Sequence, residues 1–144
     1  MELKQIYTQI ITENSRSQAN KHEVAHATHV LEGVNPTCGD EITLELRVQD
    51  GVIEDAAFVG DGCAISQASA NIMIDLIKGK TVAEAQKLAA TFTGMIKGQV
   101  TDEASLDELE DAQAFKDIAH MPARVKCATL GWHTLDEVLG KENK

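Results

Sequence analysis

The sequence has few aromatic side chains: one Trp, one Tyr and three Phe in 144 residues. Proteins that hold single-stranded nucleic acid stack the bases on aromatic rings, so this scarcity argues against such a surface. The core must instead be built mostly from Leu, Ile, Val and Ala. Apolar residues make up 43% of the chain and charged residues 25%, and these proportions are ordinary for a soluble globular domain.

Positive charge is also scarce. Lys and Arg total 13 against 23 Asp and Glu, which gives a formal net charge of −10. An acidic surface repels phosphate backbones and anionic lipid headgroups, so we expect no nucleic-acid partner and no membrane partner. The same charge could steer the chain toward a basic surface on a partner protein, but a solvated acidic face is more common than a dedicated docking surface.

Long apolar runs are absent. No segment approaches the length of a transmembrane helix. The N-terminal stretch MELKQIYTQIITENSR is amphipathic and lacks the apolar region and cleavage site of a signal peptide. The sequence therefore predicts a cytoplasmic protein. Its length predicts a single domain over residues 1–144, which is large enough to bury a core without disulfide cross-links.

Only three cysteines are present, Cys38, Cys63 and Cys127. The number is odd, no two are close in sequence and no export signal is visible, so we expect no disulfide framework. In a reducing compartment such thiols are either buried packing residues or reactive and metal-binding groups. The residues around each thiol bear on this choice.

Hydrophobic periodicity predicts strands in the first half of the chain. Residues 41–48 alternate apolar and polar side chains, as a half-buried strand does. Asp50-Gly51 is a tight hairpin signal, so residues 52–60 should form the return strand, and residues 25–36 favour a third strand upstream. These three segments predict an antiparallel meander.

Helical spacing dominates elsewhere. We expect helices over residues 3–14, from Ala64 to about Gly79, from Thr81 with a capping box to Glu84, over the acidic residues 101–120, and from Pro122 onward. The predicted fold class is therefore α+β, a small three-stranded antiparallel sheet with helices packed on one face.

The stretch HEVAH, residues 22–26, matches the H-E-x-x-H signature of zinc metalloproteases. That chemistry requires a helix, which brings the two histidines within reach of one zinc ion. Nearby Gly33 and Pro36 argue against a helix, and in an extended segment His22 and His26 would lie roughly 13 Å apart, too far for zinc to bridge. We therefore interpret these histidines as solvated or strand-face residues.

The first two thiols lie in settings that suit a ligand. Cys38 lies in NPTCGDE between two predicted strands, and Asp40, two residues later, can point its carboxylate at the same centre. Cys63 lies in VGDGCAIS, where Gly60 and Gly62 permit a close approach of the backbone. The helix expected after Cys63 favours the thiolate form, because its N-terminal N–H groups point at the sulfur.

The third thiol, Cys127, lies in MPARVKCAT near the start of the last predicted helix. Arg124 and Lys126 are cations that also favour a thiolate. Three thiolates and the Asp40 carboxylate would form a Cys₃Asp set suited to tetrahedral zinc or to iron–sulfur ligation. Widely spaced cysteines are also typical of unrelated core residues, and this alternative stays open.

The segments NPTCGDEITLEL, GDGCAISQASANIM and PARVKCATLGW resemble the U-type iron–sulfur cluster assembly proteins, the SufU/IscU family with a NifU N-terminal-like domain. The resemblance spans nearly the whole chain. The long interval between the second and third cysteines and the acidic stretch GQVTDEASLDELEDAQ resemble the SufU branch. Lys126 stands where the IscU branch has His, and HMPARVK replaces that branch's Leu-Pro-Pro-Val-Lys chaperone motif. The stretch SRSQANKHEVAHATH differs from the Asn-Pro-Arg-Asn-like element usual in the family.

The resemblance implies a zinc-dependent sulfurtransferase. It implies that zinc is bound by Cys38, Asp40, Cys63 and Cys127, and that Cys38 accepts persulfide sulfur from a SufS-type, PLP-dependent cysteine desulfurase. It further implies that a histidine of the partner replaces Cys38 on zinc during transfer and that Arg124 assists. By the same resemblance we expect the sulfur to pass to downstream iron–sulfur assembly proteins or apo-acceptors, and the PLP to belong to the partner.

Two alternatives remain. The same ligands suit a scaffold on which an iron–sulfur cluster is built, with iron or a cluster in place of zinc. A thiol hydrolase could pair Cys127 with His133 or His120, although residues six apart on a helix lie on poorly matched faces.

Overall fold

The computed structural model describes residues 2–37 and 39–140. Its elements in chain order are α1 (Leu3–Arg16), β1 (His29–Asn35), β2 (Asp40–Gln49), β3 (Val52–Asp61), α2 (Ala64–Ile77), α3 (Val82–Ile96), α4 (Glu103–Asp107), the 3₁₀ helix η1 (Glu110–His120) and α5 (Pro122–Gly140). Among these residues, no helix is both long and apolar enough to cross a membrane.

The three strands form one antiparallel sheet in the order β1-β2-β3, as the sequence predicts. The β2–β3 hairpin turns at Asp50 and Gly51, whose φ angles of 54° and 77° are the positive values that a tight two-residue hairpin requires. The alternation in β2 buries one side of the strand against the helices, through Ile42, Leu44 and Leu46.

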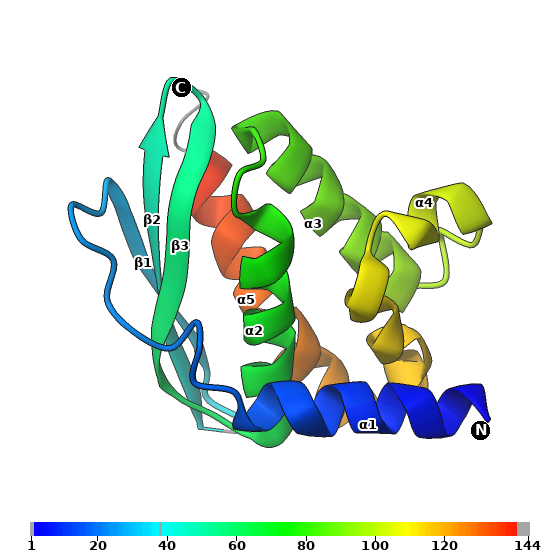
Figure 1. Ribbon diagram of the computed structural model, residues 1–144. Coiled ribbons are helices and arrows are strands. Elements are labelled where there is room, and N and C mark those ends of the chain that lie inside the picture. The colour runs from blue at the N-terminus through cyan, green and yellow to red at the C-terminus, as the bar shows by residue number, and fades with distance from the viewer. Residues whose placement is uncertain (1, 38, 141–144) are drawn as a thin grey trace.

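The helices cover one face of the sheet, as predicted (Figure 1). Helix α5 packs on β1 and β2, and α2 packs on β3 and on α5. Helix α2 is the centre of the core, because residues on nearly all of its sides are buried. Helix α1 lies across one end of this layer, against α2 and η1.

The close packing of β1 on α5 depends on Gly33. A Cβ atom at this position would overlap the Thr134 hydroxyl and would lie 3.2 Å from Leu130 Cδ1. The missing side chain therefore lets the strand backbone approach the helix. This contact lets the middle of β1 pack closely on the second half of α5.

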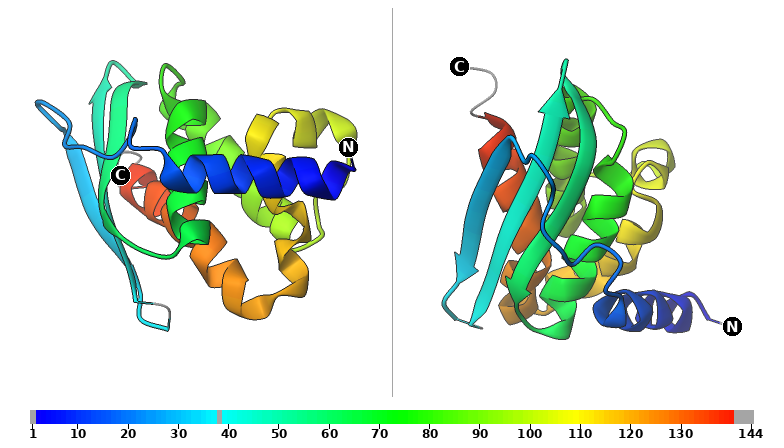
Figure 2. Two further views of the ribbon diagram at one scale, coloured as in Figure 1. Left: turned by 60° about the horizontal axis from the view of Figure 1, so that its bottom comes forward. Right: turned by 60° about the vertical axis from the view of Figure 1, so that its left-hand side comes forward.

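The opposite face of the sheet is crossed by residues 17–28, which run from α1 to β1 (Figure 2). The Asn20 carbonyl accepts a hydrogen bond of 3.0 Å from the Phe58 amide on β3, and the Thr28 amide donates one of 2.8 Å to the Leu46 carbonyl on β2. The segment is thus anchored to the sheet at both ends without forming a helix.

The HEVAH stretch lies inside this crossing segment. His26 has a φ of 57°, and His22 is exposed with Nδ1 2.9 Å from the carbonyl oxygen of Glu23. The helix that a metalloprotease signature requires is absent here, as predicted. His22 and His26 are therefore not placed one helical turn apart, as the zinc site of a metalloprotease requires.

The acidic residues 101–120 are only partly the helix that their composition predicts. They divide into the short α4 and the 3₁₀ helix η1, and Glu110 at the junction has a φ of 47°. The reason is the spacing of the apolar residues, which recur every third position, the repeat of a 3₁₀ helix. The buried residues at this spacing are Leu106, Leu109, Ala112, Phe115 and Ile118.

Candidate metal centre

Three segments meet at one end of the sheet, the lower end in Figure 1. Asp40 is the first residue of β2, Cys63 precedes α2 as its N-cap, and Cys127 lies in the second turn of α5. One carboxylate oxygen of Asp40 and the two Sγ atoms all lie within 4.8 Å of one another. Cys38 lies outside the described residues, so its predicted membership of this group stays a prediction.

The Asp40 carboxylate is buried and held by two donors. Its exposed fraction is 0%, the Cys63 amide donates to Oδ1 at 2.8 Å, and Asn35 Nδ2 donates to Oδ2 at 3.5 Å. Asn35 and Asp40 are direct partners in the β1–β2 register, so they close the hairpin that carries NPTCGD. Sequence reasoning missed Asn35, although the residue lies in that quoted motif.

Cys63 lies on the more open side of the centre and is half-buried. As the N-cap of α2 it stands where the helix presents unpaired N–H groups. The Ser66 hydroxyl donates to the Cys63 carbonyl at 3.0 Å, and Ser66 Oγ lies 3.8 Å from the thiol. The first turn of the helix thus fixes the position of the sulfur.

Gly62 is the residue that lets these groups come together. A Cβ atom here would lie 2.9 Å from Asp40 Oδ1 and would overlap the Ser66 hydroxyl. The close approach that the sequence predicts for this glycine is therefore present. Any larger residue has to move either the carboxylate or the first turn of α2.

Cys127 is fully buried, and its thiol donates to the Ala123 carbonyl one turn earlier at 3.7 Å. Asn35 Nδ2 lies 3.8 Å from its sulfur. The side chains of Arg124 and Lys126 are exposed on the same helix. The role that the sequence suggests for Arg124 remains a prediction.

The donor set fits a metal ion of the zinc type. Thiolate sulfur and a carboxylate oxygen are zinc ligands, and two sulfurs on one tetrahedral zinc lie about 3.8 Å apart, given Zn–S bonds of about 2.3 Å. The three atoms here lie within 4.8 Å of one another, so a small contraction brings them into one coordination shell. Within residues 2–37 and 39–140, this is the only such group of three His, Cys, Asp or Glu side chains.

Comparison with known proteins places this geometry in a family. The family model described as "NifU-like N terminal domain" matches residues 6–92, which contain Asp40 and Cys63. This chain belongs to the NifU-like N-terminal domain family. The family resemblance that the three cysteine-containing segments suggest is thereby confirmed.

Curated relatives of this NifU-like chain include a protein named as a scaffold and a protein named as a sulfurtransferase. It is 43% identical over 141 residues to a Thermotoga maritima protein named iron-sulfur cluster assembly scaffold protein IscU, a match covering 98% of this chain and 97% of that one. It is 39% identical over 140 residues to a Bacillus subtilis protein named zinc-dependent sulfurtransferase SufU, a match covering 97% of this chain and 93% of that one.

A solved structure supports the same fold for this NifU-like chain. The protein named FiSufU from Fervidobacterium islandicum AW-1 superposes with a TM-score of 0.87 at 38% identity, covering 96% of this chain and 99% of that one. The predicted three-stranded α+β architecture is therefore that of the family.

A groove of about 560 Å³ runs beside the centre, between the end of β1 and α5. Asn35, Pro36 and Thr37 line one wall, and Lys126 and His133 lie on the other. Because Cys38 follows Thr37 directly, the groove opens next to the segment that carries this cysteine.

The thiol-hydrolase alternative pairs Cys127 with His120 or His133. Both histidines are exposed while Cys127 is fully buried, which disfavours this alternative.

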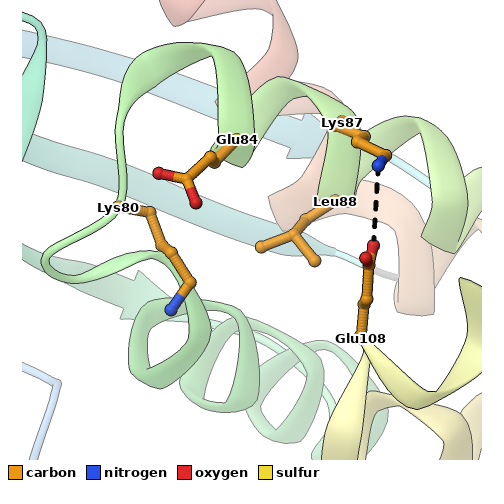
Figure 3. A pocket seen from close by; sticks show the side chains of 5 residues that line it. All are labelled: Lys80, Glu84, Lys87, Leu88 and Glu108. Atoms are coloured by element: carbon orange, nitrogen blue, oxygen red, sulfur yellow. Dashed lines mark ion pairs between the residues drawn. The ribbon is translucent and has the colours of Figure 1, made fainter.

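Another pocket, of about 290 Å³, lies between the start of α3 and the end of α4 (Figure 3). Its lining residues are Lys80, Glu84, Lys87, Leu88 and Glu108, and Lys87 and Glu108 form an ion pair of 3.9 Å. Both partners of this pair are largely exposed, so it contributes little to stability. The pocket has neither a thiol nor a histidine and takes no part in the candidate metal centre.

Replacing Gly62 by alanine is expected to weaken zinc binding by about tenfold or more, because the added methyl group displaces Asp40 Oδ1. The measurement is zinc affinity by competition with a chromogenic chelator. Gly131→Ala is the matched control, since its new Cβ would make only ordinary contacts of 3.6 Å with Ala70 and Met73 of α2. Equal zinc affinity in Gly62→Ala and wild type would show that the close approach does not matter.

Proposed function

We propose that this chain is a zinc-dependent sulfur acceptor in iron–sulfur cluster assembly, which takes persulfide sulfur from a PLP-dependent cysteine desulfurase of the SufS type. Four residues would bind the zinc: Cys38, Asp40, Cys63 and Cys127. The chain would pass the sulfur to downstream assembly proteins or apo-acceptors. The family membership and the relative named zinc-dependent sulfurtransferase SufU support this proposal.

One observation carries the proposal: Asp40, Cys63 and Cys127, from three separate segments, bring their ligand atoms within 4.8 Å of one another. Cys38 precedes Asp40 by two residues, and the pair Asn35–Asp40 closes the hairpin that contains it. The sequence neighbours Asn35 and Asp40 both lie at the centre, which supports the assignment of Cys38 as the fourth ligand. Bound zinc would keep these thiols deprotonated and protect them from oxidation.

The transfer itself is a thiol–persulfide exchange. The Cys38 thiolate attacks the outer sulfur of a persulfide on the partner's cysteine. A new S–S bond forms at Cys38, the partner's S–S bond breaks, and the partner's cysteine leaves as a thiolate. The reaction needs no oxidant or reductant, because the persulfide carries the transferred sulfur at its own oxidation level. PLP acts only on the partner, where the persulfide is generated.

Anionic sulfur is present on both sides of this exchange, and the centre itself is rich in negative charge. A cation at the rim lowers the repulsion between an incoming persulfide and the Cys38 thiolate. Arg124 is exposed and lies one turn before Cys127, so its guanidinium can serve this role. A basic surface on the desulfurase would complement the net charge of −10.

The second candidate function is that of a scaffold on which an iron–sulfur cluster is assembled. It is favoured by the Thermotoga maritima relative, whose name describes a scaffold protein. The same thiols and carboxylate would then bind the cluster as cargo rather than zinc.

The deciding experiment is the metal and sulfide content of the chain purified without oxygen. About one zinc per chain, with neither iron nor acid-labile sulfide, is the result expected for the sulfur acceptor. Iron with matching sulfide, transferable to an apo-acceptor, would overturn it in favour of the scaffold. A folded chain that binds neither metal would refute both functions at this site.

A further inference from the structure

Asn35 is a buried polar side chain that touches two members of the candidate metal centre, Asp40 and Cys127. Its Nδ2 atom lies 3.5 Å from Asp40 Oδ2 and 3.8 Å from Cys127 Sγ. Both distances are long for hydrogen bonds. The amide group has two N–H donors, so it can serve the oxygen and the sulfur at once. The residue is 5% exposed, which leaves little room for water to replace it.

The electrostatics of the centre require such donors. Three thiolates and one carboxylate around a divalent ion leave a net charge of −2, and both Asp40 and Cys127 are fully buried. Buried negative charge is costly unless hydrogen bonds satisfy it. Asn35 supplies N–H donors without adding an ionisable group of its own, and its partner across the hairpin is fixed by the strand register.

The two oxygens of Asp40 are divided between two kinds of donor. Oδ1 accepts from the Cys63 backbone amide, which no side-chain substitution removes, whereas Oδ2 accepts from Asn35. A substitution of Asn35 can therefore remove the hydrogen bond to Oδ2, while the hydrogen bond to Oδ1 stays in place. Groups of this kind orient metal ligands and commonly change metal affinity by about 10- to 100-fold when removed.

We propose that Asn35 is a positioning residue of the metal centre, which orients the Asp40 carboxylate and lowers the electron density on the Cys127 sulfur through its two N–H donors. The inference rests on the proposed function, because it takes these residues to be zinc ligands. Asn35 does not bind the ion itself. It sets how strongly Asp40 and Cys127 bind the ion.

The test uses Asn35→Leu, which keeps a similar size and removes both donors, and Asn35→Thr, which retains at most one. Zinc affinity is measured by chelator competition, and cobalt(II) replaces zinc as a spectroscopic probe. We expect Asn35→Leu to bind zinc about 10- to 100-fold more weakly. Its sulfur-to-cobalt charge-transfer band should move to longer wavelength, because a thiolate without the N–H donor gives up electrons more easily. Asn35→Thr should show a smaller shift.

The matched control is Asn71→Leu, which removes another buried amide, one that donates to Asn14 Oδ1 at 2.6 Å. Asn71 lies eight residues after Cys63, about 12 Å along α2. This variant should lose thermal stability but keep the wild-type cobalt spectrum. A purely structural role for Asn35 would give Asn35→Leu the same pattern as the control.

The outcomes separate the two proposals. If wild type gives thiolate–cobalt bands while both Asn35 variants keep its zinc affinity and spectrum, the role of Asn35 is refuted and the metal centre stands. If the wild-type chain binds neither zinc nor cobalt, the metal centre itself is wrong and the role of Asn35 falls with it. If Asn35→Leu does not fold, Asn35→Thr decides by the same criteria.

Discussion

Cys38→Ala is expected to abolish persulfide acceptance from the desulfurase. Cys127 is fully buried and Cys63 is fixed at the first turn of α2, so neither is well placed to attack a persulfide on another protein. Cys38 follows Thr37 in sequence, and Thr37 lines the groove beside α5, so Cys38 is the thiol that we expect a partner protein to reach. Removing its sulfur removes the nucleophile, and no other group can replace a thiolate in this exchange.

The measurement is mass spectrometry of the chain after incubation with a desulfurase and cysteine, which detects the addition of one sulfur atom. Thr37→Ala, which alters the adjacent loop residue and keeps the thiol, is the control and should accept sulfur. Zinc content is measured in parallel. We expect Cys38→Ala to retain zinc binding through the other three proposed ligands, but with lower affinity than wild type. A persulfide formed in full yield on Cys63 or Cys127 of the variant would contradict the assignment.

Chelation of zinc is expected to lower the melting temperature of the chain by roughly 8–16 °C. The proposed ligands belong to the β1–β2 hairpin, the start of α2 and the start of α5, so zinc binds the folded chain and not the unfolded one. Free zinc at a thousandfold excess over its Kd stabilises the folded state by about 4 kcal/mol. Each kcal/mol moves the melting temperature of a domain of this size by roughly 2–4 °C.

The melting temperature is measured by circular dichroism, with and without chelator, on protein of known zinc content. Asp40→Ala serves as the comparison, because it removes a buried carboxylate that we propose as a ligand and should show a much smaller difference between the two conditions. Identical melting temperatures for zinc-loaded and chelated wild type would mean that the metal does not link the three segments.

The sequence alone predicted most of the secondary structure, because the relevant signals are local. The alternation in residues 41–48, the turn at Asp50-Gly51 and the capping box at Thr81 each depend on neighbours within a few positions, and each is present as predicted. The acidic residues 101–120 are the exception. Their composition favours one α-helix, but only Glu103–Asp107 is α-helical. Glu110–His120 forms a 3₁₀ helix, and apolar residues that recur every third position pack it on the core.

The HEVAH stretch matches the metalloprotease signature in sequence but does not form its zinc site. The histidine spacing has meaning only on a helix, and residues 17–28 instead cross the outer face of the sheet. Flanking residues were enough to anticipate this result. The path of the segment over the sheet was not predictable, because it depends on hydrogen bonds to Phe58 and Leu46, far away in the chain.

What the sequence determined by itself is the set of chemical groups: three thiols and one carboxylate, each beside glycine, proline or charge. What only the tertiary structure decided is that Asp40, Cys63 and Cys127 share one point in space, and that Asn35 lies between two of them. The physical reason is that side-chain convergence depends on how strands and helices pack. Gly33 against Thr134 and Gly62 against Asp40 permit that packing, and such contacts between distant residues leave no local pattern in the sequence.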